Sequence, residues 1–118
     1  MITSNSFYTE AEFDEGRMYM PTHYFVHEGK YIGSVDVHEH DDCCGLWALS
    51  IKKEYRGQGY GRLMMLELMA HFGHKHLYLY VEDYNTIARH LYESVGFKPN
   101  GRHWSAAATC MEWRREYV

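Results

Sequence analysis

The sequence predicts a mixed α/β fold, or α+β on a stricter reading, with a mixed β-sheet in the order β-β-β-α-β-α-β-β. Three observations predict this fold. Short β-rich segments flank two segments of helical periodicity, a glycine-rich turn leads into the first helical segment, and hydrophobic residues make up 46% of the 118 residues. A chain of this length favours one core, so we expect a single domain over residues 1–118.

The first half of the chain is rich in strand signals. The stretch "HYFVHEGKYIGSVDVHE" predicts a hairpin with strands over 23–27 and 30–38 and a turn at Glu28-Gly29. After a polar turn, the apolar run 46–51 predicts a strand buried on both faces. Ahead of the hairpin, the segment 8–17 has room for one short acidic helix.

The segment that follows carries the first helix and a further strand. Apolar side chains from Gly61 to about His74 form a broad helical face. The short run 76–81 is β-rich and predicts a strand. A strand, helix and strand in this order form a right-handed crossover that joins two parallel strands.

A second helix and two closing strands complete the prediction. Asp83 or Asn85 can cap a helix that runs to about Val95 and ends at Gly96. Its apolar residues Ile87, Leu91 and Val95 recur at i, i+4 and i+8, as on one helical face. The segments 97–104 and 109–118 predict two strands around a polar turn.

Charge is unevenly distributed along the chain. Residues 1–45 hold nine acidic and two basic side chains, a net −7, whereas residues 46–118 hold ten basic and seven acidic, a net +3. Such a division suits a chain that attracts a cation with one half and holds an anion with the other, although two ordinary solvated faces account for it equally well. The net charge of −4 and the lack of a basic, aromatic stripe argue against nucleic-acid binding.

The composition also indicates a compartment. The sequence contains neither a secretory signal pattern in its first 20 residues nor an apolar run of membrane length, so we expect no membrane association. Its three cysteines, two of them adjacent, do not form a disulfide framework and favour a reducing environment. We therefore expect a soluble cytoplasmic protein.

The stretch "EYRGQGYGRL" places Gly57, Gly59 and Gly61 within five positions, between a strand and a helix. Unpaired amides at a helix N-terminus attract anions, and glycines remove the β-carbons that would keep a phosphate away. The spacing therefore predicts a main-chain cradle for a diphosphate. A P-loop is excluded because Arg62-Leu63 replaces Lys-Ser/Thr, and the glycine spacing does not fit the Rossmann pattern.

Two motifs together resemble a known family. Arg56, Gly59 and Gly61 form Arg-x-x-Gly-x-Gly. Downstream, "NTIARHLYESVGF" (85–97) has the spacing that follows the fifth strand of the GNAT superfamily of acyl-CoA-dependent N-acetyltransferases. Residues 46–97 thus resemble the GNAT core, and the terminal "CMEWRREY" is similar to its closing strand. The resemblance implies a GNAT-like fold with a shortened N-terminal region.

The resemblance also implies acetyl-CoA as co-substrate. Amides of residues 57–61 would bind the coenzyme diphosphate, and the main chain around 49–51 would pair with the pantetheine arm and hold the thioester carbonyl. Lys52, Lys53, Arg62 and Arg89 are candidates for the ribose 3′-phosphate, and each is also readily understood as a solvated charge. The expected coenzyme-binding residues are Leu49, Ser50, Ile51, Arg56, Gly57, Gln58, Gly59, Tyr60, Gly61, Arg62, Asn85 and Arg89.

For catalysis, Tyr92 matches the tyrosine that protonates the leaving thiolate in the family, a role that suits a phenol. The general base stays open. Trp47 and Ala48 occupy the positions where many members offer a carboxylate, so deprotonation falls to water or to Glu82, His38 or His103. Of these, Glu82 is our candidate. No metal is expected, because "HEHDDCC" (38–44) has ligand residue types without ligand spacing.

These expectations lead to one principal function and one alternative. The first is an N-acetyltransferase that transfers an acetyl group from acetyl-CoA directly to a cationic primary amine, such as a protein lysine or N-terminus, a polyamine or an aminoglycoside. The shortened N-terminal region leaves the acceptor side open, either for a bulky acceptor or for a homodimer whose partner supplies the missing wall. The alternative is a non-catalytic acyl-CoA-binding or protein-interaction module.

Overall fold

The computed structural model describes residues 7–10 and 22–117 of the chain. The strands are β1 (Phe7–Glu10), β2 (Thr22–His27), β3 (Lys30–Glu39), β4 (Cys43–Ile51), β5 (His76–Glu82), β6 (Lys98–Ser105) and β7 (Ala108–Trp113). The helices are α1 (Tyr60–Phe72) and α2 (Thr86–Ser94), with short 3₁₀ turns η1 (Lys53–Tyr55) and η2 (Arg115–Tyr117). None of the helices in these ranges is long and apolar enough to cross a membrane.

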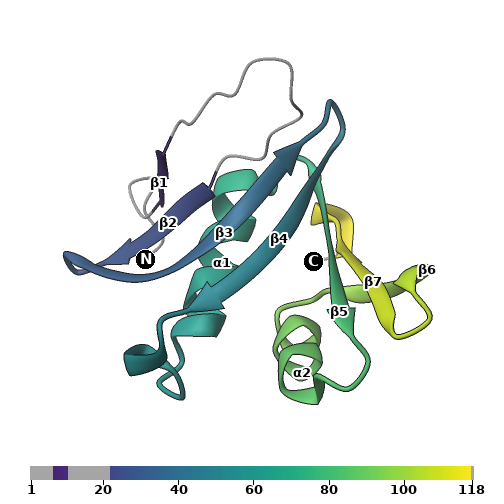
Figure 1. The fold of residues 1–118 in the computed structure, drawn as a ribbon. Helices are drawn as coiled ribbons and strands as arrows, with labels where there is room; N and C mark the ends of the chain where they lie inside the picture. The colour runs from purple at the N-terminus through teal and green to yellow at the C-terminus, as the bar shows by residue number, and fades with distance from the viewer. Residues whose placement is uncertain (1–6, 11–21, 118) are drawn as a thin grey trace.

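All seven strands form one mixed sheet in the order β1-β2-β3-β4-β5-β7-β6 (Figure 1). Every neighbouring pair is antiparallel except β4 and β5, which are parallel and are joined through α1. The predicted fold class and the order from the hairpin onward are confirmed.

The N-terminal prediction is wrong in one respect. Phe7–Glu10 forms a strand that pairs antiparallel with β2, so the helix expected over 8–17 does not include residues 8–10; residues 11–17 lie outside the described part. The edge of β2 offers unpaired backbone groups, and pairing with them satisfies the backbone hydrogen bonds of this short segment. A helix would instead require a costly first turn.

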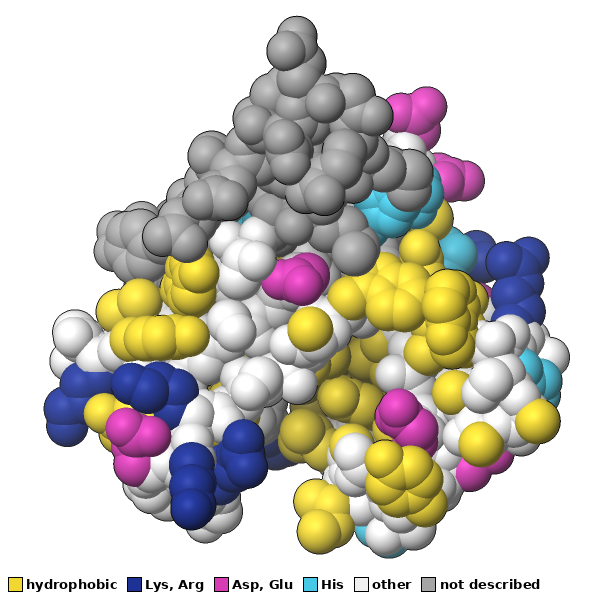
Figure 2. Space-filling view, viewed as in Figure 1, with side chains coloured by type: hydrophobic (Ala, Val, Ile, Leu, Met, Phe, Trp, Pro, Cys, Tyr) yellow, Lys and Arg dark blue, Asp and Glu magenta, His cyan; other side chains and the backbone are white. Residues whose placement is uncertain are grey.

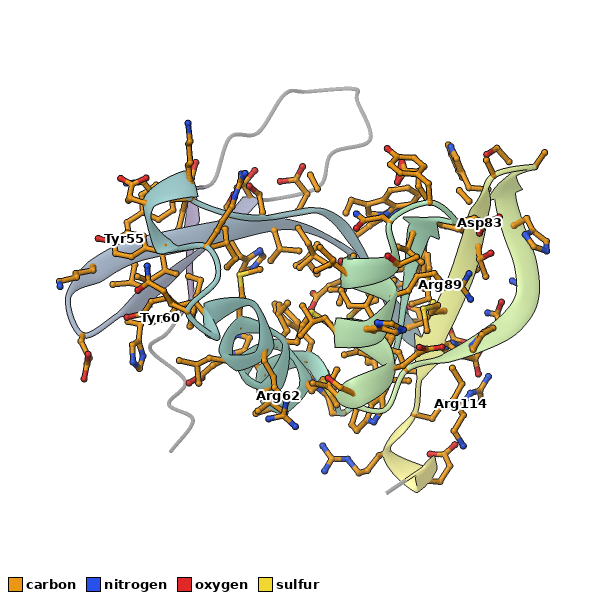
Figure 3. All side chains as sticks on the ribbon, turned by 90° about the horizontal axis from the view of Figure 1, so that it is seen from below. Tyr55, Tyr60, Arg62, Asp83, Arg89 and Arg114 are labelled. Atoms are coloured by element: carbon orange, nitrogen blue, oxygen red, sulfur yellow. The ribbon has the colours of Figure 1, made fainter. Side chains whose placement is uncertain are left out.

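Both helices lie side by side on one face of the sheet (Figure 3). The core between helices and sheet is built from apolar side chains of both. Those with the largest volumes among the fully buried ones are Phe25, Phe97, Ile32, Leu46, Met65, Leu68, Leu77, Leu79 and Met111. Alternate residues of β5 supply Leu77, Leu79 and Val81 to this core, which leaves Tyr78 and Tyr80 on the opposite face of the sheet.

The periodicity of α2 is only partly as expected. Ala88, Leu91, Tyr92 and Val95, at i, i+3, i+4 and i+7, pack against the core, whereas Ile87 is 83% exposed. At about 100° per residue, Ile87 lies roughly a quarter turn from the centre of that face. The apolar stripe predicted through Ile87 is therefore wrong at its first position.

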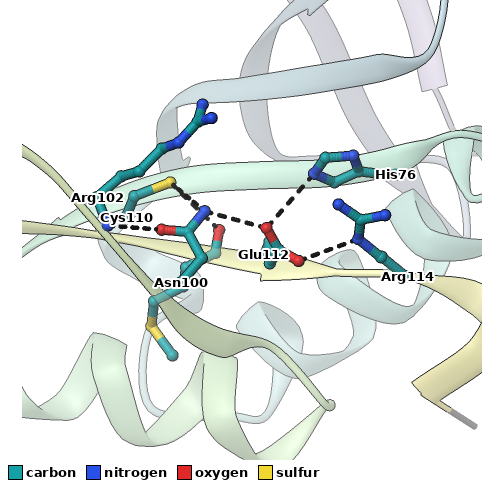
Figure 4. Close-up of polar contacts among 7 residues, drawn as sticks. His76, Asn100, Arg102, Cys110, Glu112 and Arg114 are labelled. Carbon is teal, nitrogen blue, oxygen red and sulfur yellow. Dashed lines mark hydrogen bonds and ion pairs between the residues drawn. The ribbon is translucent and has the colours of Figure 1, made fainter.

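On the opposite face of the sheet, a polar network joins β5, β6 and β7 (Figure 4). The Glu112 carboxylate accepts a hydrogen bond from Asn100 Nδ2 at 3.1 Å, and it lies 3.7 Å from His76 Nε2 and 3.0 Å from Arg114 Nε. Asn100 Oδ1 also accepts from the Arg102 amide at 3.0 Å. This half-buried carboxylate is thus fully engaged and holds the C-terminal hairpin against β5.

Candidate active site

The two parallel strands separate partway along their length. Pairing between β4 and β5 runs from Cys43–His76 to Leu46–Leu79 and stops there, after which the strands diverge (Figure 1). From Trp47 to Ile51, β4 therefore has a strand neighbour on the β3 side alone, and its other edge presents backbone N–H and C=O groups to the gap. The burial predicted on both faces of 46–51 is wrong, because Ala48 and Ser50 are exposed whereas the alternate residues Leu49 and Ile51 pack against the core.

A β-bulge lies where the gap begins. Ser34 pairs with Ser50 and Asp36 with Trp47, so Val35 faces two residues, Ala48 and Leu49. Ala48 has a φ of +53°, a left-handed conformation that costs a non-glycine residue about 1–2 kcal/mol. Strain of this kind, at a bulge beside an open strand edge, is common where a backbone group is aimed at a ligand.

A cavity of about 340 Å³ occupies the gap, and Figure 2 shows it as a hollow lined by hydrophobic side chains. Four of the residues predicted from sequence line it: Leu49, Glu82, Asn85 and Tyr92. The other lining residues are Leu46, Trp47, Ala48, Tyr80, Val81, Trp104 and Ala108. The structure thus brings both predicted catalytic residues into one hollow with the open edge of β4.

Tyr92 enters the cavity from α2. Burial raises the pKa of its phenol above the ordinary value of 10.0, and the nearby Glu82 carboxylate raises it further. The ring packs 6.3 Å from that of Phe97, which anchors it to the core. Tyr92 is therefore a fixed, protonated donor at neutral pH.

The general-base candidates lie in different places. Glu82 is at the end of β5, exposed and in the cavity wall. His38 lies on β3 with its ring 4.2 Å from that of His40, and His103 is exposed on β6; neither lines the cavity. Among the three, the structure places Glu82 alone beside Tyr92.

The glycine-rich loop lies between η1 and α1, where Lys and Arg side chains gather at the lower left of Figure 2. Gly57 and Gly59 have φ values of +74° and +87°, and a β-carbon on either would meet nothing within 4 Å. Both therefore need glycine for backbone conformation and face open space. Gly61 differs, because a β-carbon there would lie 3.2 Å from Leu91 Cδ2. Its role is to let α1 approach α2 next to Tyr92.

The side chains of three residues in the predicted coenzyme-binding set make contacts that brace this loop. Arg56 Nε donates to the Ile51 carbonyl at 2.8 Å, and Gln58 Nε2 donates to the Glu54 carbonyl at 3.0 Å. The Tyr60 ring packs at right angles to that of Tyr55, with centroids 5.8 Å apart (Figure 3). These three side chains stabilise the conformation of the loop, and the groups that the loop offers to a ligand are its backbone amides.

The four basic candidates for the ribose 3′-phosphate fall into two groups, those already paired with another side chain and those exposed near the loop. Lys52 lies 3.7 Å from Glu54 and over the Tyr31 ring, and Arg89 lies 3.9 Å from Asp83 (Figure 3). Arg62 is exposed on the first turn of α1, close in sequence to the glycines, and Lys53 is exposed in η1. Arg62 and Lys53 are thus the better placed for a phosphate at the loop.

The β5–α2 turn is tied to the C-terminal hairpin. Asp83 Oδ1 accepts a hydrogen bond from Thr109 Oγ1 at 2.6 Å, and the Asp83 amide donates to the Ala107 carbonyl at 2.7 Å. Asn85 Oδ1 accepts from the Ala88 amide at 3.2 Å and so caps α2, as predicted. Asn85 therefore has a structural function as well as a place in the cavity wall.

We expect Asn85→Ala to lower the free energy of unfolding by about 1 kcal/mol, because it removes this cap, whereas Asn85→Asp keeps an acceptor oxygen and loses much less. Denaturant unfolding of the two variants and the parent measures the difference. An equal loss in both variants would contradict the capping role. Because Asn85→Asp keeps the cap, the coenzyme affinity of this variant measures how much the Asn85 side chain contributes to coenzyme binding.

The three thiols are unsuited to carry an acyl group. Burial raises the pKa of Cys44 to about 11, and burial is also the main cause of the raised pKa values of Cys43 and Cys110. None of them lines the cavity. No three His, Cys, Asp or Glu side chains in the described ranges are grouped so that they could hold a metal ion. The cavity therefore offers the phenols of Tyr80 and Tyr92 and the carboxylate of Glu82 as its proton-transfer groups.

The aromatic part of the cavity was not predicted from sequence. Trp47 was expected only as the residue that replaces a carboxylate, and no site role was expected for Tyr80 or Trp104. The alternation of Tyr78 and Tyr80 with leucines in "HLYLYV" is the signal that could have placed Tyr80 on the face of β5 away from the helices.

The model of the acetyltransferase (GNAT) family matches residues 3–97. The chain belongs to the GNAT acetyltransferase family. The match includes the glycine-rich loop, the separated strands and α2 of this GNAT protein, whereas β6 and β7, which bring Trp104 and Ala108 to the cavity, lie beyond it. No curated protein matches the sequence.

Solved structures show the same fold. The ribosomal-protein-S18-alanine N-acetyltransferase from Escherichia coli is 24% identical, with a TM-score of 0.64 over 77% of this chain and 66% of that one. PaiA N-acetyltransferase from Thermoplasma acidophilum, in complex with coenzyme A, is 22% identical, with a TM-score of 0.66 over 79% and 59%. Spermidine N-acetyltransferase from Vibrio cholerae, with CoA and spermine, is 19% identical, with a TM-score of 0.71 over 82% and 66%. This GNAT chain thus spans 59–66% of their lengths, and at these identities the likeness establishes the fold alone.

Proposed function

We propose that the chain is an acetyl-CoA-dependent N-acetyltransferase that transfers an acetyl group directly to a primary amine. The observation that carries this proposal is the cavity between β4 and β5, where protonated Tyr92 lies with Glu82 beside an unpaired strand edge. Family membership supports the reaction class, and two of the structures with the same fold contain coenzyme A.

The residues present fit a coenzyme A thioester. The open space above Gly57 and Gly59 gives main-chain amides access to a diphosphate, and the unpaired edge of β4 around Leu49–Ile51 can pair with the amides of a pantetheine arm. Bound there, the thioester supplies an activated acetyl group. Exposed Lys53 and Arg62 provide positive charge next to the loop.

The protein groups have distinct tasks in a direct transfer. A neutral amine forms a C–N bond to the acetyl carbon while the C–S bond breaks. Glu82 accepts the proton that the amine nitrogen loses, directly or through water, and Tyr92 donates its proton to the departing sulfur. The strained bulge at Ala48 and Leu49 orients backbone at the strand edge where the acetyl carbonyl would lie. High thiol pKa values favour this route over an acyl-cysteine intermediate.

The acceptor in our proposal is a cationic primary amine: a protein lysine or N-terminus, a polyamine or an aminoglycoside. The carboxylate of Glu82 in the cavity wall supports a cationic acceptor. The structures of similar fold include one enzyme named for a ribosomal protein alanine and one for spermidine, so the fold serves both kinds of acceptor.

The test is amine-dependent release of free thiol from acetyl-CoA, with the three acceptor kinds assayed in parallel. Turnover with one of them supports the proposal. Calorimetric titration with acetyl-CoA, with 3′-dephospho-CoA as the comparison, runs beside the assay. Coenzyme binding without turnover on any amine would contradict an enzyme and favour the non-catalytic module.

The proposal also includes the cellular location and the oligomeric state of the protein. The free thiols Cys43, Cys44 and Cys110 support the reducing cytoplasmic location predicted from composition. A homodimer that walls the acceptor side stays a prediction, which sedimentation analysis of the full chain would decide.

A further inference from the structure

Three aromatic side chains from three strands form one wall of the cavity. The rings of Trp47 on β4 and Tyr80 on β5 have centroids 5.3 Å apart. The Trp104 ring on β6 lies 5.3 Å from Trp47 and 5.6 Å from Tyr80. All three residues line the cavity that holds Tyr92 and Glu82. We call this cluster the aromatic wall.

The wall is built into the strands, yet one member is left uncovered. A β-carbon at Gly45 would lie 3.0 Å from Trp47 Nε1 and 2.6 Å from the Tyr78 hydroxyl, so glycine at this position is what allows the Trp47 ring to lie against β4. Trp104 is nevertheless 68% exposed. A tryptophan held by two ring contacts but open to solvent at a cavity mouth is typical of a binding surface.

The charge in the cavity is negative. Of the residues that line it, Glu82 is the one that carries a formal charge at neutral pH, and neither Lys nor Arg is among them. Burial raises the pKa of Tyr80, as it does that of Tyr92, so both phenols are neutral. Arg102 lines the neighbouring hollow together with Tyr80, and from there its charge partly offsets the rise in the Tyr80 pKa. The faces of indole and phenol rings attract cations, and tryptophan does so most strongly.

The attacking amine has to be neutral, so it cannot itself supply a charge for these rings while it reacts. We propose that the aromatic wall selects acceptors that carry a second, positively charged group, and that this group lies against Trp47, Tyr80 and Trp104 while the neutral amine faces the acetyl carbon. The acceptor class is a diamine or polyamine, or a peptide amine next to a basic side chain. The inference rests on the proposed function and names its acceptor.

The first test compares acceptors of matched length: 1,4-diaminobutane, n-butylamine and 4-aminobutanoate, each with acetyl-CoA. We expect kcat/KM for the diamine to exceed that for butylamine about tenfold, with 4-aminobutanoate the poorest. In Trp104→Leu, which keeps apolar bulk and removes the π face, the preference should fall to about twofold. The diamine should account for most of this fall, because a single amine has no second charge to place against the wall.

Tyr84→Leu is the control variant, since Tyr84 is also a highly exposed aromatic residue, at 81%, and does not line the cavity. It should retain the tenfold preference. Equal kcat/KM values for diamine and butylamine in the parent protein, or a preference that survives Trp104→Leu unchanged, would overturn the inference. Trp104 is exposed enough for its replacement to leave the fold intact.

A second readout separates this inference from the proposed function. Two of the three tryptophans belong to the wall, and the third, Trp113, is buried, so intrinsic fluorescence reports on the wall. We expect a saturable change with 1,4-diaminobutane that is lost in Trp104→Leu. Saturable diamine binding without thiol release would support the wall and contradict acetyl transfer. If butylamine and the diamine were turned over with equal efficiency and no saturable fluorescence change appeared, acetyl transfer would be supported and the role of the aromatic wall would be contradicted.

Discussion

Tyr92→Phe should lower kcat by about 10²-fold and leave the affinity for acetyl-CoA unchanged. The substitution removes a single oxygen, and the ring keeps its packing against Phe97. Loss of a general acid costs about 10²–10⁴-fold in typical cases. Steady-state kinetics together with calorimetric titration of acetyl-CoA separate the two quantities. A parallel loss of coenzyme affinity would indicate a binding role for the hydroxyl instead of proton donation.

The raised pKa of Tyr92 also predicts how kcat should depend on pH. Because burial and the Glu82 carboxylate raise that pKa above 10.0, the phenol keeps its proton throughout the neutral and mildly alkaline range. The parent protein should therefore show no fall in kcat from loss of this proton below pH 10. A basic limb between pH 8 and 9 that vanishes in Tyr92→Phe would contradict the assignment.

Gly57→Ala and Gly59→Ala should each raise the Kd for acetyl-CoA about tenfold. Both glycines have positive φ, and an alanine there costs about 1–2 kcal/mol unless the loop changes shape, which would turn its amides away from a diphosphate. Calorimetric titration of each variant measures the Kd. The chain offers matched controls for the backbone strain: Gly29 has a φ of +76° and Gly101 of +86°, and a β-carbon on either would meet nothing within 4 Å.

Gly29→Ala and Gly101→Ala should therefore lose stability to a similar extent and bind acetyl-CoA as the parent does. If all four variants weakened coenzyme binding equally, the effect would come from stability alone and the cradle would be wrong. Thermal unfolding of the four variants, followed by circular dichroism, measures the loss of stability in each for this comparison.

Features set by local sequence were predictable. The spacing of apolar residues predicts α1 to within two residues at its end, and Asn85 is one of the two predicted caps for α2. The loop 56–61 was predictable because three glycines in five positions are costly in a regular helix or strand and suit a main-chain cradle. Tyr92 came from the family motif, and the structure places it in the cavity.

Features that depend on strand register were out of reach. The aromatic wall joins three strands that are distant in sequence, and its existence depends on where the pairing of β4 and β5 stops. The exposure of Ala48 and Ser50 on one face of β4 is likewise not revealed by an apolar run. Gly61 is part of the predicted cradle, but the approach of Leu91 of α2 to within 3.2 Å of its β-carbon position, a second reason for glycine there, depends on how the helices pack. Strand β1 escaped prediction because four residues carry too weak a pattern.

In our proposal, main-chain amides of residues 57–61 hold the diphosphate of an acyl-CoA whose thioester reaches the cavity beside Tyr92. Titration of uniformly ¹⁵N-labelled protein with acetyl-CoA, followed by amide chemical shifts, tests it most directly. We expect saturable shifts for the amides of Gly57 to Gly61 and for Leu49 to Ile51, with dephosphorylated pantetheine reproducing the second group and not the first. Shifts centred on the opposite hollow around Glu112, with the loop amides unmoved, would contradict it.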